Sequence, residues 1–220
     1  MRPLTSLLLL LFTCFLTQAQ EREVLLTNSQ KIIEDRYEGI KGSPYAFKEW
    51  HPATIINTEA KAIEVTAINY NALTQDIEVK KGSQFIALAP AWYVRIIIHV
   101  SDTEDIIFQR AFLTSLQNNF MQLVYEGDQV QLYKKIEKDI STKTFNDVGK
   151  TREVKRFVGQ IRYYLVENEE VMNFKLNKKD FLKKIGKRKV VEGFLKKNKL
   201  KLNKEGDLIE LMKFYDTLKE

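Results

Sequence analysis

The chain has 220 residues, of which 44% are hydrophobic and 29% charged, and its formal net charge at pH 7 is +6. It contains one cysteine and two histidines, so a disulfide framework or a cysteine-based zinc site is excluded. A chain of this length can bury an adequate hydrophobic core without such cross-links, as one large or two small domains.

The first twenty residues, MRPLTSLLLLLFTCFLTQAQ, have the layout of a secretory signal peptide. Arg2 precedes an apolar run over residues 7–16, and Ala19 is a small residue after which signal peptidase could cut. Ten helical residues cover about 15 Å, which is too short to span a hydrocarbon core of about 30 Å. We therefore expect residues 1–19 to be removed and the mature chain to be periplasmic, associated with the outer membrane, or secreted.

Cys14 allows a second interpretation, as the lipid-attachment cysteine of a lipoprotein. The residues before it, LFT, lack the small residue that such signals place ahead of the cysteine, and the apolar run continues beyond it. We favour cleavage after Ala19, which leaves a mature chain without cysteine and therefore without a thiolate nucleophile.

Residues 20–140 are expected to form a β-rich domain. Short β-branched runs alternate with turn signals, and within them apolar and polar residues alternate. Ile63 and Val65, for example, share one side of an extended chain while Glu64 lies on the other. These patterns predict strands that each have one face exposed to water.

The connections between these strands are short and contain turn residues, such as Gly82 and Gly127. Short connections force neighbouring strands to be antiparallel. The expected structure is an antiparallel meander, either an open sheet or a small barrel, with YVRIII (residues 93–98) as its most central strand.

Residues 141–156 are polar and weakly patterned, so we interpret them as a linker or loop at a domain boundary. Residues 157–220 are expected to form a hairpin and then a basic subdomain of three amphipathic helices. Asn177 fits a helix cap, and Asp180 fits the acidic third position near the positive end of a helix. Together these elements predict an α+β fold.

The two parts of the chain differ in charge. Residues 21–150 contain 15 basic and 18 acidic residues, whereas residues 151–220 contain 19 basic and 11 acidic residues. The excess is concentrated over residues 181–204, where ten lysines and arginines accompany a single acidic residue, Glu192. The lysines point away from the predicted apolar helix faces, as a solvated face requires, but an ordinary solvated face mixes both signs.

Three interpretations of this basic stretch remain open: a solvated face, a surface for anionic lipid or acidic glycan, and a nucleic-acid site. Export, the shortage of arginine and the lack of interleaved aromatic residues argue against nucleic acid. Lysine near an anionic membrane contributes about 1 kcal/mol per residue, so an envelope polyanion suits the stretch better. The candidate polyanion-binding residues are Lys183, Lys184, Lys187, Lys189 and Lys196.

Aromatic residues gather over residues 42–52, GSPYAFKEWHP, and a second pair follows Pro90. Rings exposed on a loop can stack on sugar or peptide. They can also close the open end of the sheet, and we favour this role because large rings dominate core burial. The candidate binding residues are Tyr45, Phe47, Trp50, Trp92 and Tyr93.

Catalytic motifs are missing from the sequence: it has no GxSxG elbow, phosphate-binding glycine loop or dinucleotide fingerprint. His51 and His99 have no metal-ligand spacing. Adjacent acidic residues such as Glu104 and Asp105 point apart in an extended chain, which suits general acid and base catalysis poorly. We predict no catalytic residue, metal or cofactor, and a non-catalytic interaction protein. An unrecognised hydrolase is the remaining enzymatic alternative.

Several segments, taken in order, resemble exported hypothetical proteins of Bacteroidota over nearly all of the mature chain. These segments are GSPY with EW, INYNALTQDIEVKKGSQFIAL, FMQLVYEGDQVQLYKK, RYYLV and FLKKNKLKLNKEGDLIELMKFY. The resemblance implies a cell-envelope or secreted location and supplies no catalytic residues. The expected partner is therefore an unknown envelope protein or glycan, or an anionic membrane surface, and no nucleic acid.

Overall fold

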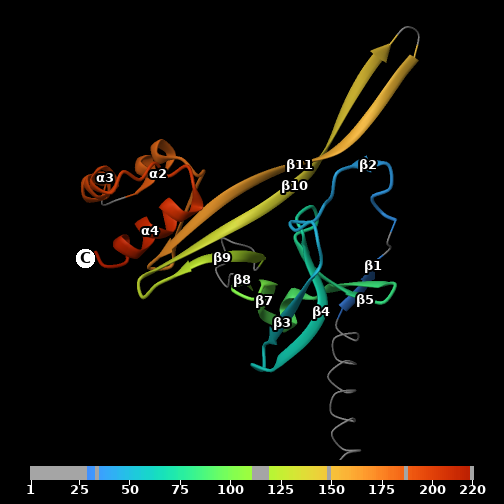
Figure 1. The fold of residues 1–220 in the computed structure, drawn as a ribbon, viewed down its shortest axis with the longest axis horizontal. Helices are drawn as coiled ribbons and strands as arrows, with labels where there is room; N and C mark the ends of the chain where they lie inside the picture. The colour runs from blue at the N-terminus through green and yellow to red at the C-terminus, as the bar shows by residue number, and fades with distance from the viewer. Residues whose placement is uncertain (1–28, 33–34, 111–118, 148–149, 186–187, 219–220) are drawn as a thin grey trace, which may run out of the picture.

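The computed structural model describes residues 29–32, 35–110, 119–147, 150–185 and 188–218 (Figure 1). The expected signal peptide and Cys14 lie outside these residues. None of the described helices has the length and apolar character needed to cross a bilayer.

The described residues form one twelve-stranded sheet, in which all pairs of strands are antiparallel except that of β2 with β11. The strands are β1 (Ser29–Ile32), β2 (Ile40–Lys41), β3 (His51–Asn57), β4 (Ala62–Asn71), β5 (Asp76–Lys81), β6 (Gln84–Leu88), β7 (Tyr93–Ser101), β8 (Glu104–Arg110), β9 (Phe120–Glu126), β10 (Val130–Asp147), β11 (Lys150–Glu167) and β12 (Glu170–Phe174).

The strand order is β1-β6-β5-β4-β3-β7-β8-β9-β10-β11-β12, and β2 pairs with β11 outside this path. The sheet is therefore open, with β1 and β12 at its ends. The predicted α+β class is confirmed, and of the two expected forms the open sheet is the one observed. β7, which contains YVRIII, lies at the middle of the order, as predicted.

Apolar residues at alternate positions of the central strands build the first hydrophobic cluster. Ala53 lies opposite Ile98 and Ile55 opposite Ile96 where β3 pairs with β7, and all four are fully buried. Alternation with period two therefore places one face of these strands in the core. Other large members of this cluster are Tyr70, Tyr93, Phe108 and Phe120.

β10 and β11 form a ribbon that pairs from Val130 opposite Glu167 to Asp147 opposite Lys150. Its outer part leaves the body of the molecule (Figure 1), and we call residues 140–147 and 150–157 the arm. The prediction of a linker or loop over residues 141–156 is wrong, because the described residues of this segment belong to β10 and β11. Solvent reaches both faces of the arm, so its sequence has no apolar face that would produce a period-two pattern.

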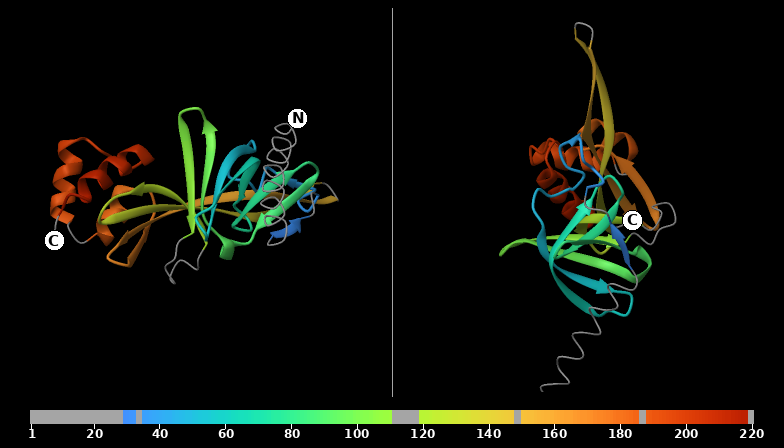
Figure 2. Two further views of the ribbon diagram at one scale, coloured as in Figure 1. Left: turned by 90° about the horizontal axis from the view of Figure 1, so that it is seen from below. Right: turned by 90° about the vertical axis from the view of Figure 1, so that its right-hand side faces the viewer.

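The described residues also form three α-helices and a short 3-10 helix, η1 (Pro90–Trp92). The α-helices gather at the end of the ribbon opposite the arm tip (Figures 1 and 2). Together with β10, β11 and β12 they bury a second hydrophobic cluster that includes Leu132, Leu165, Phe181, Leu195 and Leu211. The α-helices are α2 (Lys178–Lys184), α3 (Arg188–Lys197) and α4 (Glu205–Tyr215).

Candidate functional site

The aromatic loop before β3 is held against β4 by polar contacts. The side chain of Asn69 donates to the carbonyl oxygens of Phe47 and Glu49, at 3.1 and 3.0 Å, and accepts from the Phe47 backbone N–H at 3.3 Å. From the ribbon, Lys138 Nζ donates to the carbonyl oxygens of Ser43 and Tyr45. The loop is therefore fastened to both β4 and β10.

Beneath this loop lies a carboxylate, Glu78 of β5, which is fully buried. Its oxygens accept from Arg36 Nη2 at 2.5 Å, from Asn71 Nδ2 at 2.7 Å and from the Tyr45 hydroxyl at 2.9 Å. Burial raises the pKa of Tyr45, and the negative charge of Glu78 raises it further. The phenol therefore keeps its proton and donates a hydrogen bond to Glu78, which compensates part of the cost of burying the charge of this carboxylate.

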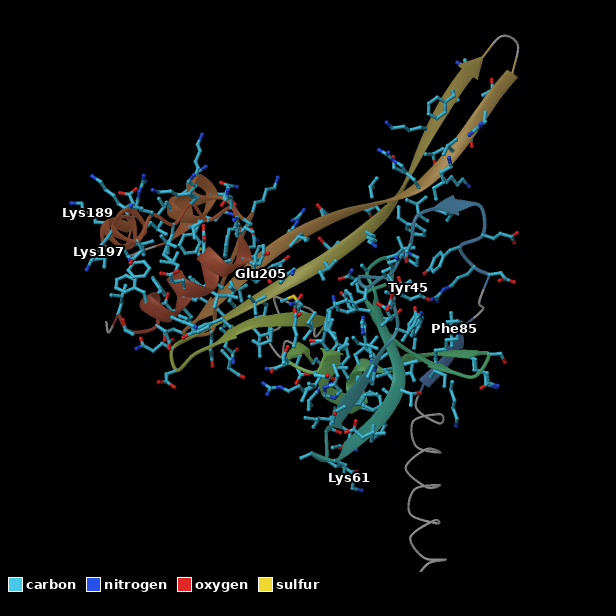
Figure 3. The ribbon with its side chains drawn as sticks, in the orientation of Figure 1. Tyr45, Lys61, Phe85, Lys189, Lys197 and Glu205 are labelled. Atoms are coloured by element: carbon cyan, nitrogen blue, oxygen red, sulfur yellow. The ribbon has the colours of Figure 1, made fainter. Side chains whose placement is uncertain are left out.

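The rings of the loop go in two directions. The ring of Tyr45 meets that of Trp50 at a centroid distance of 5.1 Å, and the ring of Trp50 meets that of Phe85 in β6 at 5.4 Å. Figure 3 labels Tyr45 and Phe85, the two ends of this row of rings. Phe47 instead turns toward Phe108 of the first cluster, at 6.3 Å. The structure thus brings together Tyr45 and Trp50 and adds Phe85, which we did not identify from the sequence.

The second aromatic pair is split by the alternation of the backbone. Trp92 ends η1 with half of its surface exposed, whereas Tyr93 begins β7 and is buried in the first cluster. Of these two rings, only that of Trp92 is therefore accessible to a partner.

Four of the five candidate lysines lie on helices, Lys183 and Lys184 on α2 and Lys189 and Lys196 on α3. Lys183, Lys184, Lys189 and Lys196 are exposed, and Lys184 Nζ also donates to the Asn173 carbonyl oxygen. Lys187 lies outside the described residues. Figure 3 places Lys189, with Lys197, at the helical end of the molecule.

Four strands bring together a polar row that we did not identify from the sequence. His99 Nδ1 lies 2.8 Å from Asp105 Oδ1, and His99 Nε2 lies 3.0 Å from Thr54 Oγ1. Thr54 Oγ1 in turn donates to Glu64 Oε1 at 2.8 Å. The row has the order carboxylate, imidazole, hydroxyl that nucleophilic catalysis uses, although the single hydroxyl proton of Thr54 can go only to Glu64 or to His99.

The register of the sheet accounts for this row, because His99 pairs with Asp105 and Thr54 with Glu64 across neighbouring strands. The side chains of His99 and Asp105 are 35% and 53% exposed, so the row lies at the surface of the sheet. A cross-strand pairing prediction is the signal that could have found it.

The arm carries exposed apolar side chains on both faces. Ile140 and Phe145 are 42% and 53% exposed, and Phe145 lies opposite Arg152. At its base Phe157 meets Tyr37 edge-on at 5.5 Å, which joins the arm to the segment before β2.

Among the described residues, no group of three or more potential metal-ligating side chains could hold a metal ion. Comparison with protein-family models, with curated proteins and with solved structures gives no match. The geometry of the chain itself therefore carries the functional argument.

Proposed function

We propose that the protein is an exported, non-catalytic binding protein of the cell envelope, and that the arm is its contact with a partner protein. The resemblance to exported Bacteroidota proteins and the layout of residues 1–19 support the location. The observation that carries the binding role is the arm itself.

The outer part of the arm, residues 142–147 and 150–154, pairs with no other described strand. An isolated two-stranded hairpin is marginally stable in water, and ordering each residue costs about 1–2 kcal/mol of conformational free energy. The arm nevertheless stays strand over its described length and holds Ile140 and Phe145 in solvent. Exposed apolar residues on a projecting element are typical of a protein contact surface.

A comparison of two forms of the mature protein tests the role of the arm. In the shortened form Asn-Gly replaces residues 144–153, which closes a two-residue turn between Lys143 and Val154 and keeps both the pairing of β2 with β11 and the contact of Phe157 with Tyr37. We expect the full protein to capture a partner from envelope extract and the shortened form, although folded, to lose it. Equal capture by both forms would reject the arm as the contact.

The location has its own test, which is the amino-terminal sequence of the protein recovered from cell fractions. We expect envelope or medium fractions to contain a chain that begins at Gln20. A chain with an intact amino terminus in the cytosol would reject export.

A second candidate function is the binding of anionic lipid or acidic glycan through the helices. It is favoured by Lys183, Lys189 and Lys196, which are exposed and form no ion pair with any other described residue. Their change to glutamate should abolish retention on anionic vesicles, and high salt should weaken retention of the unmodified protein. The matched control changes an equal number of exposed lysines on the β-rich part, namely Lys41, Lys48 and Lys81.

A hydrolase is the third candidate, favoured only by the row of Asp105, His99 and Thr54. Turnover of p-nitrophenyl acetate should then disappear in both His99→Gln and Thr54→Val. It should persist in Thr66→Val, which changes an exposed threonine of β4 outside the row. Equal turnover in all forms would dismiss the row as a catalytic site.

A further inference from the structure

The free edge of β10 suggests what kind of partner the arm accepts. β10 pairs with β9 only between Gln131 and Lys134. Farther out, the Lys138 N–H donates to the Ala72 carbonyl oxygen, and the Ile136 carbonyl oxygen accepts from the Gln75 side chain. The even-numbered residues of β10 therefore direct their backbone groups toward this edge.

Because backbone direction alternates along an antiparallel strand, the same edge continues outward along the arm. No described strand lies beside β10 there. The residues that direct their backbone N–H and C=O groups to this open edge are Ile140, Thr142, Thr144 and Asn146. An edge of this kind is a template for an added strand.

The charge of the arm is concentrated on one of its faces. Lys143, Phe145, Arg152 and Arg156 share a face, because Arg152 lies opposite Phe145 and Arg156 opposite Ser141, and all four are exposed. We call this the basic face. Over residues 140–146 of β10 and the residues of β11 that pair with them, the basic face contains no acidic residue. The opposite face of the same stretch contains one acidic residue, Glu153, and one basic residue, Lys155.

Resting on the proposed function, we propose that the arm binds an extended, acidic segment of a partner protein, which adds as a strand to the free edge of β10. Its backbone would pair with the open edge, and carboxylates at alternate positions would lie on the basic face. Directly opposite side chains of neighbouring strands are about 5 Å apart, so these carboxylates would lie beside Lys143. Arg152 and Arg156 are one strand farther away.

An added acidic strand accounts for both the open backbone edge and the basic face of the arm. Each of the alternatives, a membrane or glycan and a second copy of the chain, accounts for only one of these features. An anionic membrane or glycan would meet the positive side chains and leave the backbone edge unpaired. A second copy, paired antiparallel along the same edge, would bring the positive side chains of two basic faces together, and like charges across strands are destabilising.

The test uses the mature protein and a fluorescent peptide in which glutamate alternates with threonine and valine, with a control peptide that has lysine in place of glutamate. We expect the acidic peptide to bind and to slow hydrogen exchange at the Thr142 and Thr144 amides. The lysine peptide should bind at least about tenfold more weakly. Equal binding of both peptides would overturn the proposal.

Two matched pairs of variants separate the edge from the charge. Thr144→Pro removes an outward N–H without touching a bond to β11, and we expect it to weaken peptide binding about tenfold relative to Thr144→Val. Arg152→Glu should likewise weaken binding, whereas Lys155→Glu, on the opposite face of the same strand, should not. Unchanged binding by Thr144→Pro would overturn the added strand. Unchanged binding by Arg152→Glu would overturn the role of the basic face.

Two further outcomes would also overturn the proposal. One is association of the protein with itself through the arm in the absence of peptide. The other is arm-dependent retention on anionic vesicles that Thr144→Pro leaves unchanged. If the full protein captures a partner through the arm but the acidic peptide does not bind, this inference fails while the proposed function stands.

Discussion

Asp216 shows how one carboxylate joins the end of α4 to the sheet. It accepts backbone hydrogen bonds from Asp128, Gln129 and Val130 at 3.0, 2.8 and 2.9 Å, in the turn between β9 and β10. Desolvation raises the pKa of Asp216, but these hydrogen bonds outweigh it, so the pKa lies below its ordinary value. The hydrogen bonds to the Asp216 carboxylate thus hold the turn between β9 and β10 against the end of α4.

Replacing this carboxylate should make the protein less stable at neutral pH. We expect Asp216→Asn to lower the free energy of unfolding by about 1 kcal/mol at pH 7, a value discounted for solvent exposure. A depressed pKa in the folded state stabilises the protein above the unfolded value of about 3.9, and this stabilisation is lost as pH falls through the folded pKa. Urea unfolding at pH 7 and pH 3 should show the difference between the two proteins shrinking with acid.

Gly127 supplies a steric control for the same contact. A Cβ atom at this position would lie 2.4 Å from Asp216 Oδ2, so Gly127→Ala should destabilise the protein. In an Asp216→Ala background the obstructing oxygen is gone, and the same change should cost less. Additive effects in this double-mutant cycle would argue against the contact.

Among the helices, α2 begins with a cap that local sequence predicts. Asn177 Oδ1 accepts from the Asp180 N–H at 2.8 Å, and Asp180 Oδ2 accepts from the Lys175 N–H at 2.7 Å. Asn177→Ala should reduce stability by about 1 kcal/mol, while Asn177→Ser, which keeps an acceptor, should cost much less. Thermal unfolding measures both, and equal losses would show that the cap contributes little.

The cap and the central strand were predictable because their signals are local: a polar residue before an amphipathic run, and alternation within a few residues. The arm was missed because neither face of residues 141–156 is buried. The sequence of this segment therefore lacks the alternation of apolar and polar residues that predicts a strand. The row of Asp105, His99 and Thr54 was missed for a different reason. It depends on the register between strands, which a reading of single segments does not contain.

At the scale of the whole molecule, the described residues of one continuous sheet carry three hydrophobic clusters, of which the third and smallest consists of Met121, Leu123 and Tyr133. β9 contributes to all three, with Phe120 in the first cluster, Val124 and Tyr125 packed against the second, and Met121 and Leu123 in the third. The helices cover only the second cluster. This arrangement predicts that the helical end can open without unfolding the central strands, because the first and second clusters have no buried residue in common.

Two buried residues of similar size allow a matched test of this prediction. Leu211 in α4 and Ile96 in β7 are both fully buried, one in each cluster, and either change to alanine should cost about 2–5 kcal/mol locally. In native-state hydrogen exchange, Leu211→Ala should lower protection in α2, α3, α4 and β12 and leave β3 and β7 protected. Ile96→Ala should lower protection in β3 and β7. Equal loss of protection in both regions for Leu211→Ala would mean that the sheet couples the clusters into a single cooperative unit.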